Sequence, residues 1–120
     1  MNHYKRDKTE PFWWGLFAAG GMVAAMLIPM HLFINGLAPH LGLAGAEVNG
    51  YEAMRELISH PLAKLYFLIM IVMPLYHAAH RLRFTIYELG VRGPGLSILC
   101  SGGALVGTGL AAYIFFHLLP

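Results

Sequence analysis

Three stretches of the chain are apolar over more residues than a soluble domain of this size could bury. They cover about residues 12–38, 62–88 and 96–119, and the first and third contain no charged side chain. A hydrocarbon core of ~30 Å is crossed by ~20 helical residues, and a helix satisfies its own backbone hydrogen bonds in lipid. The sequence therefore predicts an all-α integral membrane protein, in which residues 1–120 form one membrane-anchor domain with three transmembrane helices.

The scarcity of charge narrows the functions that the chain can perform alone. Charged residues make up 12% of it, about half of the roughly 25% found in soluble domains. The formal charge of +2 is too small and too scattered to favour a nucleic acid partner. The single cysteine, Cys100, excludes an internal disulfide and is interpreted as a small buried hydrophobic residue. We expect no metal site and no soluble catalytic domain.

The distribution of basic residues predicts the orientation. Arg55 and Lys64 follow the first helix, whereas the other six Lys and Arg residues precede it or follow the second helix: Lys5, Arg6, Lys8, Arg81, Arg83 and Arg92. The positive-inside rule then predicts a cytoplasmic N-terminus and an external C-terminus. A cleaved signal peptide ending near residues 44–46 is disfavoured, because the preceding apolar run exceeds the ~7–15 residues of such a segment.

Two kinds of local pattern add detail. In 47–60, the apolar Tyr51, Met54 and Leu57 are separated by charged residues, which predicts a short amphipathic helix at the outer interface. Gly103 and Gly107, one helical turn apart in the third helix, indicate a face that another helix can approach closely. That face could pack within the chain or against a partner protein, and we favour the partner.

Residues with useful chemistry gather at the predicted cytoplasmic end. His77, His80 and Arg81 end the apolar part of the second helix, and Trp13, Trp14 and Phe17 begin the first. The tryptophans could form only an aromatic belt, and the arginines only interfacial anchors. Together, however, aromatic walls, imidazoles and a guanidinium also suit a flat ligand with two carbonyl groups, such as a quinone.

Several segments carry a resemblance to one known family. They are EPFWWGLF at 10–17, AGGM at 19–22, LGL at 41–43, Tyr51-Glu52, LIMIVMPL at 68–75 and His80-Arg81. In this order and spacing the chain resembles the D subunit, a hydrophobic anchor, of four-subunit fumarate reductases. The third helix matches only in its hydrophobicity.

The resemblance implies partners and cofactors. The D subunit pairs with a second anchor, the C subunit, in the bacterial cytoplasmic membrane. The two hold a flavoprotein with FAD and an iron–sulfur protein on the cytoplasmic face. Menaquinol is oxidised at the cytoplasmic end of the anchors, and fumarate is reduced in the flavoprotein. The matching positions for the quinone site are Trp14, Phe17 and Arg81, with His80 adjacent and with His77 and Trp13 as possible secondary contacts.

Two residues depart from the family pattern, namely His77 and Arg83. A histidine could ligate a haem shared with the second anchor, as in an anchor of a haem-containing succinate dehydrogenase, but we expect no haem because lone membrane histidines usually serve packing. A purely structural assembly protein is the other alternative. Transport is disfavoured because the middles of the helices carry no ionisable residue.

Overall fold

The described part of the chain folds into three long helices and one short α-helix. The structure, a computed structural model, describes residues 10–43 and 50–120. Its elements are α1 (Glu10–His31), the π-helical η1 (Leu32–Leu37), α2 (Tyr51–Ser59), α3 (Pro61–Glu88), α4 (Pro94–Tyr113) and the π-helical η2 (Ile114–Leu118). Within the described ranges there is no strand. The predicted all-α class is therefore confirmed.

Among the described residues, three helical segments are long and apolar enough to cross a membrane. They are Trp14–Leu37, Pro61–Glu88 and Pro94–Leu118, with 24, 28 and 25 residues. At 1.5 Å per residue the shortest of them is about 36 Å long, which exceeds a hydrocarbon core of ~30 Å. The chain is thus a membrane protein with three spanning helices, as its sequence predicts.

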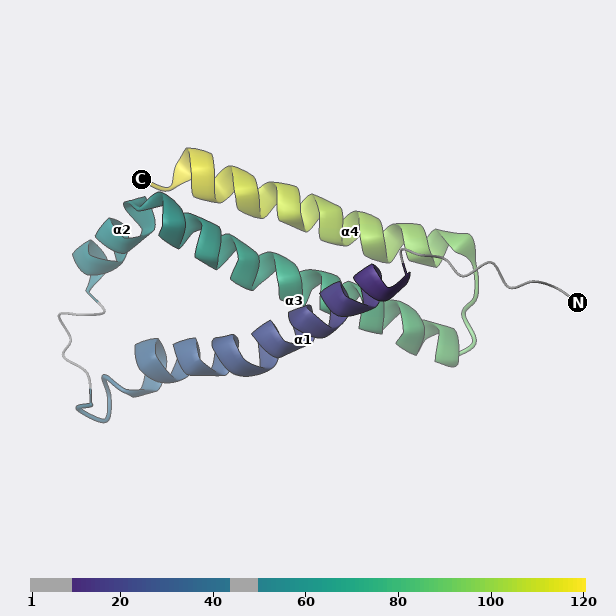
Figure 1. Cartoon of the computed structure of the whole chain (residues 1–120), viewed down its shortest axis with the longest axis horizontal. Helices are drawn as coiled ribbons and strands as arrows, with labels where there is room; N and C mark the ends of the chain where they lie inside the picture. The colour runs from purple at the N-terminus through teal and green to yellow at the C-terminus, as the bar shows by residue number, and fades with distance from the viewer. Residues whose placement is uncertain (1–9, 44–49) are drawn as a thin grey trace, which may run out of the picture.

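The central helix is α3. Both α1 and α4 pack against it, on different sides, and α1 crosses it at a visible angle (Figure 1). In the part of the chain that the structure describes, the backbones of α1 and α4 do not contact each other. Each outer helix therefore keeps much of its surface free for lipid or for another protein.

Local chemistry explains where the helices begin. Pro61 and Pro94 occupy the first turns of α3 and α4, where the missing N–H costs no hydrogen bond. His60 caps α3, because its Nδ1 accepts a hydrogen bond of 3.3 Å from the backbone N–H of Leu62. After α3, Gly90 adopts a φ of +93°, which favours glycine, and the chain then turns back toward α4.

The short helix α2 follows the sequence pattern of 47–60. It covers Tyr51–Ser59 and lies beside the start of α3, near the C-terminus (Figure 1). Its place in the outer membrane interface remains a prediction, as does the orientation of the whole bundle. The residues 44–46 of the signal-peptide alternative lie outside the described residues, as do Lys5, Arg6 and Lys8.

The bundle has almost no core of the soluble kind. Among the described residues only Ala38 and Ala104 are buried hydrophobic residues. Large apolar side chains on both outer helices are more than 60% exposed: Met22, Met26, Ile98, Leu99, Leu105 and Val106. Exposure of so much apolar surface to water is unfavourable, so lipid or partner helices must cover it.

Glycines allow the close approaches to α3, and one of them corrects the sequence analysis. A Cβ atom on Gly107 would lie 2.8 Å from Cδ2 of Leu75, so this glycine packs against α3 within the chain. A Cβ atom on Gly103 would meet nothing within 4 Å. The assignment of Gly107 to a partner face was therefore wrong, because its small size serves the contact between α3 and α4.

Candidate functional site

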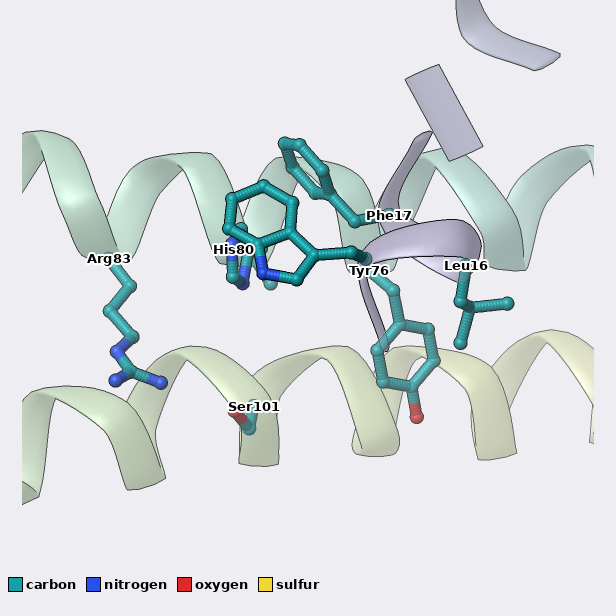
Figure 2. Close-up of a pocket in the computed structure, with 8 residues that line it drawn as sticks. Leu16, Phe17, Tyr76, His80, Arg83 and Ser101 are labelled. Carbon is teal, nitrogen blue, oxygen red and sulfur yellow. The ribbon is translucent and has the colours of Figure 1, made fainter. Parts of the chain in front are cut away.

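A cavity of about 430 Å³ lies between the three long helices, near the beginning of α1 and α4 and the end of α3. α1, α3 and α4 all contribute to it, and side chains of all three helices converge there in Figure 2. The volume is in the range of sites for small organic ligands. The lining residues are Trp14, Leu16, Phe17, Tyr76, Ala79, His80, Arg83 and Ser101.

Three rings form one wall of the cavity. The Phe17 and His80 rings are tilted with centroids 4.5 Å apart. Trp14 approaches both edge-on, at 5.7 Å from Phe17 and 5.9 Å from His80. Such offset and edge contacts are favourable for aromatic rings, and they give the wall a defined shape. The structure thus brings together three predicted site residues from two helices that are far apart in the sequence.

His77 stands behind this wall and fixes Phe17. Its ring stacks on that of Phe17 with centroids 4.2 Å apart and an interplanar angle of 9°. Its Nδ1 donates a hydrogen bond of 2.8 Å to the carbonyl oxygen of Phe17. Gly21 leaves the space for this imidazole, because a Cβ there would lie 2.8 Å from Cε1 of His77. His77 does not line the cavity, so its contacts are those of a support.

Of the two arginines near the end of α3, only Arg83 lines the cavity. Arg81 is exposed and lies on another face of the helix. The Arg83 guanidinium is 5.5 Å from the centroids of both the Phe84 and Tyr87 rings, within the range of cation–π attraction. Its Nε is buried and has no hydrogen-bond partner among the described residues.

Arg83, Tyr76 and Ser101 line the cavity but are not among the site residues predicted from the sequence. A signal was nevertheless present, because Tyr76, His80 and Arg83 are spaced by four and three residues and so share one face of a helix. Ser101 offered no such signal, since its position depends on how α4 packs. Trp13 lies in α1, but its side chain is outside the described residues.

A second cavity, of about 660 Å³, lies at the opposite end between α2 and η2. Two basic side chains near it have partners within the chain. Lys64 Nζ donates a hydrogen bond of 3.2 Å to the carbonyl oxygen of Leu119, and Arg55 lies 4.0 Å from a carboxylate oxygen of Glu52. In the described residues, no three His, Cys, Asp or Glu side chains gather to hold a metal ion.

The first cavity has the character of a site for a flat, mainly apolar ligand. Rings supply area for stacking, and an imidazole and a guanidinium offer polar contacts on the α3 side. The fold and this cavity together define the class of protein as an integral membrane protein with three spanning helices, in the described residues, and a cavity at one end of them.

Comparisons with known proteins identify the family. The family model for the D subunit of fumarate reductase matches residues 4–116. A fumarate reductase D subunit of Mycobacterium bovis is 37% identical over 113 residues, covering 92% of this chain and 89% of that protein. Those of Aliivibrio fischeri and Photobacterium profundum are 32% and 33% identical, each covering 97% of this chain and 98% of the relative. The chain belongs to the family of fumarate reductase D subunits, and this membership supports a membrane-anchor role in a fumarate reductase complex.

Proposed function

We propose that this protein anchors a fumarate reductase complex in the bacterial cytoplasmic membrane and helps to form its menaquinol oxidation site. Together with a second membrane anchor it holds an iron–sulfur protein and a flavoprotein with FAD, which reduces fumarate. The main observation in support of the quinol site is the cavity in which Trp14, Phe17 and His80 converge from two helices.

The residues of the cavity suit the head group of a quinol. Trp14 and Phe17 offer ring surface to a flat naphthalene system. His80 lines the same cavity, and an imidazole can accept a proton near neutral pH. A bound quinol supplies two electrons and two protons. Arg83 is independent support, because its guanidinium lines the cavity and has no hydrogen-bond partner among the described residues, so its terminal N–H groups can donate to a quinol oxygen.

Arg81 also contributes to the proposed site, but from a face of α3 that lies outside the cavity. Its side chain is exposed in this chain, on a face of α3 that is available to a second membrane anchor. A cation there would stabilise negative charge on a quinone oxygen at the boundary between the two anchors, and such preorganised charge is worth a few kcal/mol in a dry site. We therefore propose that the site is shared between the two anchors.

The proposed orientation places this cavity on the cytoplasmic side. Arg81 and Arg83 lie near the end of α3 and Arg92 just before α4, at the cavity end, whereas Arg55 lies in α2 and Lys64 at the start of α3. The positive-inside rule assigns the more basic end to the cytoplasm, where the iron–sulfur protein would take up the electrons. The exposed apolar surface of α4 is available for the second anchor.

The test separates quinol chemistry from assembly. In the purified complex, Arg81→Leu should reduce quinol-linked fumarate reduction by about a hundredfold, as expected for a lost few kcal/mol of charge stabilisation. Trp14→Ala should mainly raise the apparent KM for quinol. Fumarate reduction with a soluble artificial donor should survive in both variants, because that donor bypasses the anchors.

Two results would contradict the proposal. If both activities of Arg81→Leu and Trp14→Ala fall together, these residues only hold the complex together, as in a purely structural assembly protein. If neither variant changes quinol-linked turnover, the quinol is oxidised elsewhere, for example entirely within the second anchor.

A further inference from the structure

Arg83 presents a guanidinium to which the described residues give no hydrogen-bond partner. Its side chain is partly buried at the end of α3, and Nε is shielded by the chain itself, whereas the two terminal nitrogens are not buried. Native proteins nearly always pair such strong donors, and where their own chain supplies no acceptor, a ligand, a water molecule or a partner chain does so. Because Arg83 lines the cavity, a ligand in that cavity can reach the terminal N–H groups.

Helix geometry separates Arg83 from Arg81. Two consecutive steps along a helix turn the side chain by about 200°, so the two arginines point to nearly opposite sides of α3. Arg83 instead shares its face with His80 and Tyr76, which also line the cavity. A ligand between the helices can therefore meet Arg83 and His80 together, while Arg81 reaches it only around the edge of α3.

The guanidinium is held in place before any ligand arrives. It lies 5.5 Å from the centroids of the Phe84 and Tyr87 rings. In Figure 2 the side chain extends from α3 toward α4, on the side where Ser101 lies, whereas Phe17 lies on the side of α1. Such packing limits the conformations that a long side chain must lose on binding. A planar donor opposite an aromatic wall matches a flat ring with an acceptor oxygen at its edge.

We propose that Arg83 is a binding residue of the quinone site and that the terminal N–H groups of its guanidinium donate a hydrogen bond to an oxygen of the quinone head group. This inference rests on the proposed function and adds a contact that the family resemblance does not supply. Arg83 acts inside the cavity, and Arg81 acts from the boundary between the two anchors.

The experiment measures binding as well as turnover in the whole purified complex. Menadione, a soluble naphthoquinone, is titrated into the complex by calorimetry, and the KM for the corresponding quinol is measured separately. Arg83→Gln should weaken menadione binding and raise KM by about tenfold to a hundredfold, the usual loss for a hydrogen bond to a charged group. Fumarate reduction with a soluble donor should remain, because it reports assembly.

Two further variants sharpen the measurement. Arg83→Lys keeps the charge and the interfacial anchor but removes the planar pair of terminal donors, so it should restore only part of the affinity. Arg55→Gln removes an arginine from the opposite end of the bundle, where it pairs with Glu52, and should leave menadione affinity unchanged.

Each outcome decides between the proposals. If Trp14→Ala weakens menadione binding and Arg83→Gln does not, Arg83 has no role in the site, while the proposed function stands. If neither variant changes binding, both proposals fail. If Arg83→Lys binds menadione as well as the unmodified complex does, the charge is sufficient and no specific donor is needed. If quinol-linked and soluble-donor fumarate reduction fall equally in Arg83→Gln and Arg83→Lys, Arg83 only anchors the complex. Either result would overturn the inference.

Discussion

Each end of the helix bundle has a cavity with basic and aromatic side chains nearby. The two ends differ in whether the polar atoms of these side chains have hydrogen-bond partners within the chain. At the end with α2, Lys64 donates to the Leu119 carbonyl oxygen, and both ring nitrogens of His31 have partners, at 2.7 Å on Leu27 O and 3.3 Å on the Tyr66 hydroxyl. At the other end, the buried Nε of Arg83 has no partner among the described residues.

This difference separates basic residues that stabilise the chain from those available to a ligand. Membrane proteins place Lys and Arg near helix ends whether or not anything binds there, so their presence alone decides little. A basic group already bonded to a carbonyl oxygen within its own chain contributes to packing. A guanidinium that lines a cavity and has no such bond is the one whose N–H groups a ligand can pair.

The largest expected effect concerns which end faces the cytoplasm. A reporter that is active only outside the cytoplasm should be active after Pro120 and silent at Gly93, while a cytoplasmic reporter should behave in the opposite way. The reason is the excess of Lys and Arg at the cavity end. The reverse pattern would place the cavity on the outer side, away from the electron-accepting proteins. The difference between the two ends would then no longer support a quinol site at the cavity end.

The histidines at the two ends should respond differently to the same change. His77→Leu removes the stacking on Phe17 and the hydrogen bond to its carbonyl oxygen, so the cavity wall loses its support. We expect the KM for quinol to rise about three- to tenfold, matching a loss of ~1 kcal/mol. His31→Leu should leave this KM unchanged and should lower only stability, because its contacts lie away from the cavity.

Both variants need the same two measurements, namely quinol KM and thermal unfolding of the complex. Equal loss of stability with no change of KM in His77→Leu would mean that Phe17 keeps its position without the imidazole. In that case His77 would belong with His31 among the packing residues.

Sequence alone predicted the helices well, because spanning a membrane demands an apolar run whose length is set by the bilayer. It also placed Trp14, Phe17 and His80 at one end, since the order of three antiparallel helices dictates which ends meet. It named Arg81 and not Arg83, because the resemblance pointed to Arg81 and only the packing of α3 shows that the face with Tyr76, His80 and Arg83 lines the cavity. Gly107 was misassigned for the same reason, because a small residue looks alike on a face toward α3 and on a face toward a partner.

The smallest expected effect is at Lys64. Its Nζ donates to the carbonyl oxygen of Leu119 at the end of η2, and so ties the last helical turn to the start of α3. Lys64→Met keeps most of the length of the side chain and removes the donor. Near the membrane surface water can hydrate the freed carbonyl, so the loss should be at most about 1 kcal/mol of unfolding free energy.

The informative readout for Lys64→Met is therefore what stays the same. Thermal unfolding of the complex should shift slightly downward, while menadione affinity and quinol KM should equal those of the unmodified complex, because the amine already has its partner in the chain. Arg83→Gln changes a basic residue at the other end whose buried donor has none among the described residues. If Lys64→Met and Arg83→Gln weakened menadione binding equally, the lack of a hydrogen-bond partner within the chain would not distinguish a ligand-binding residue from an interfacial anchor in this bundle.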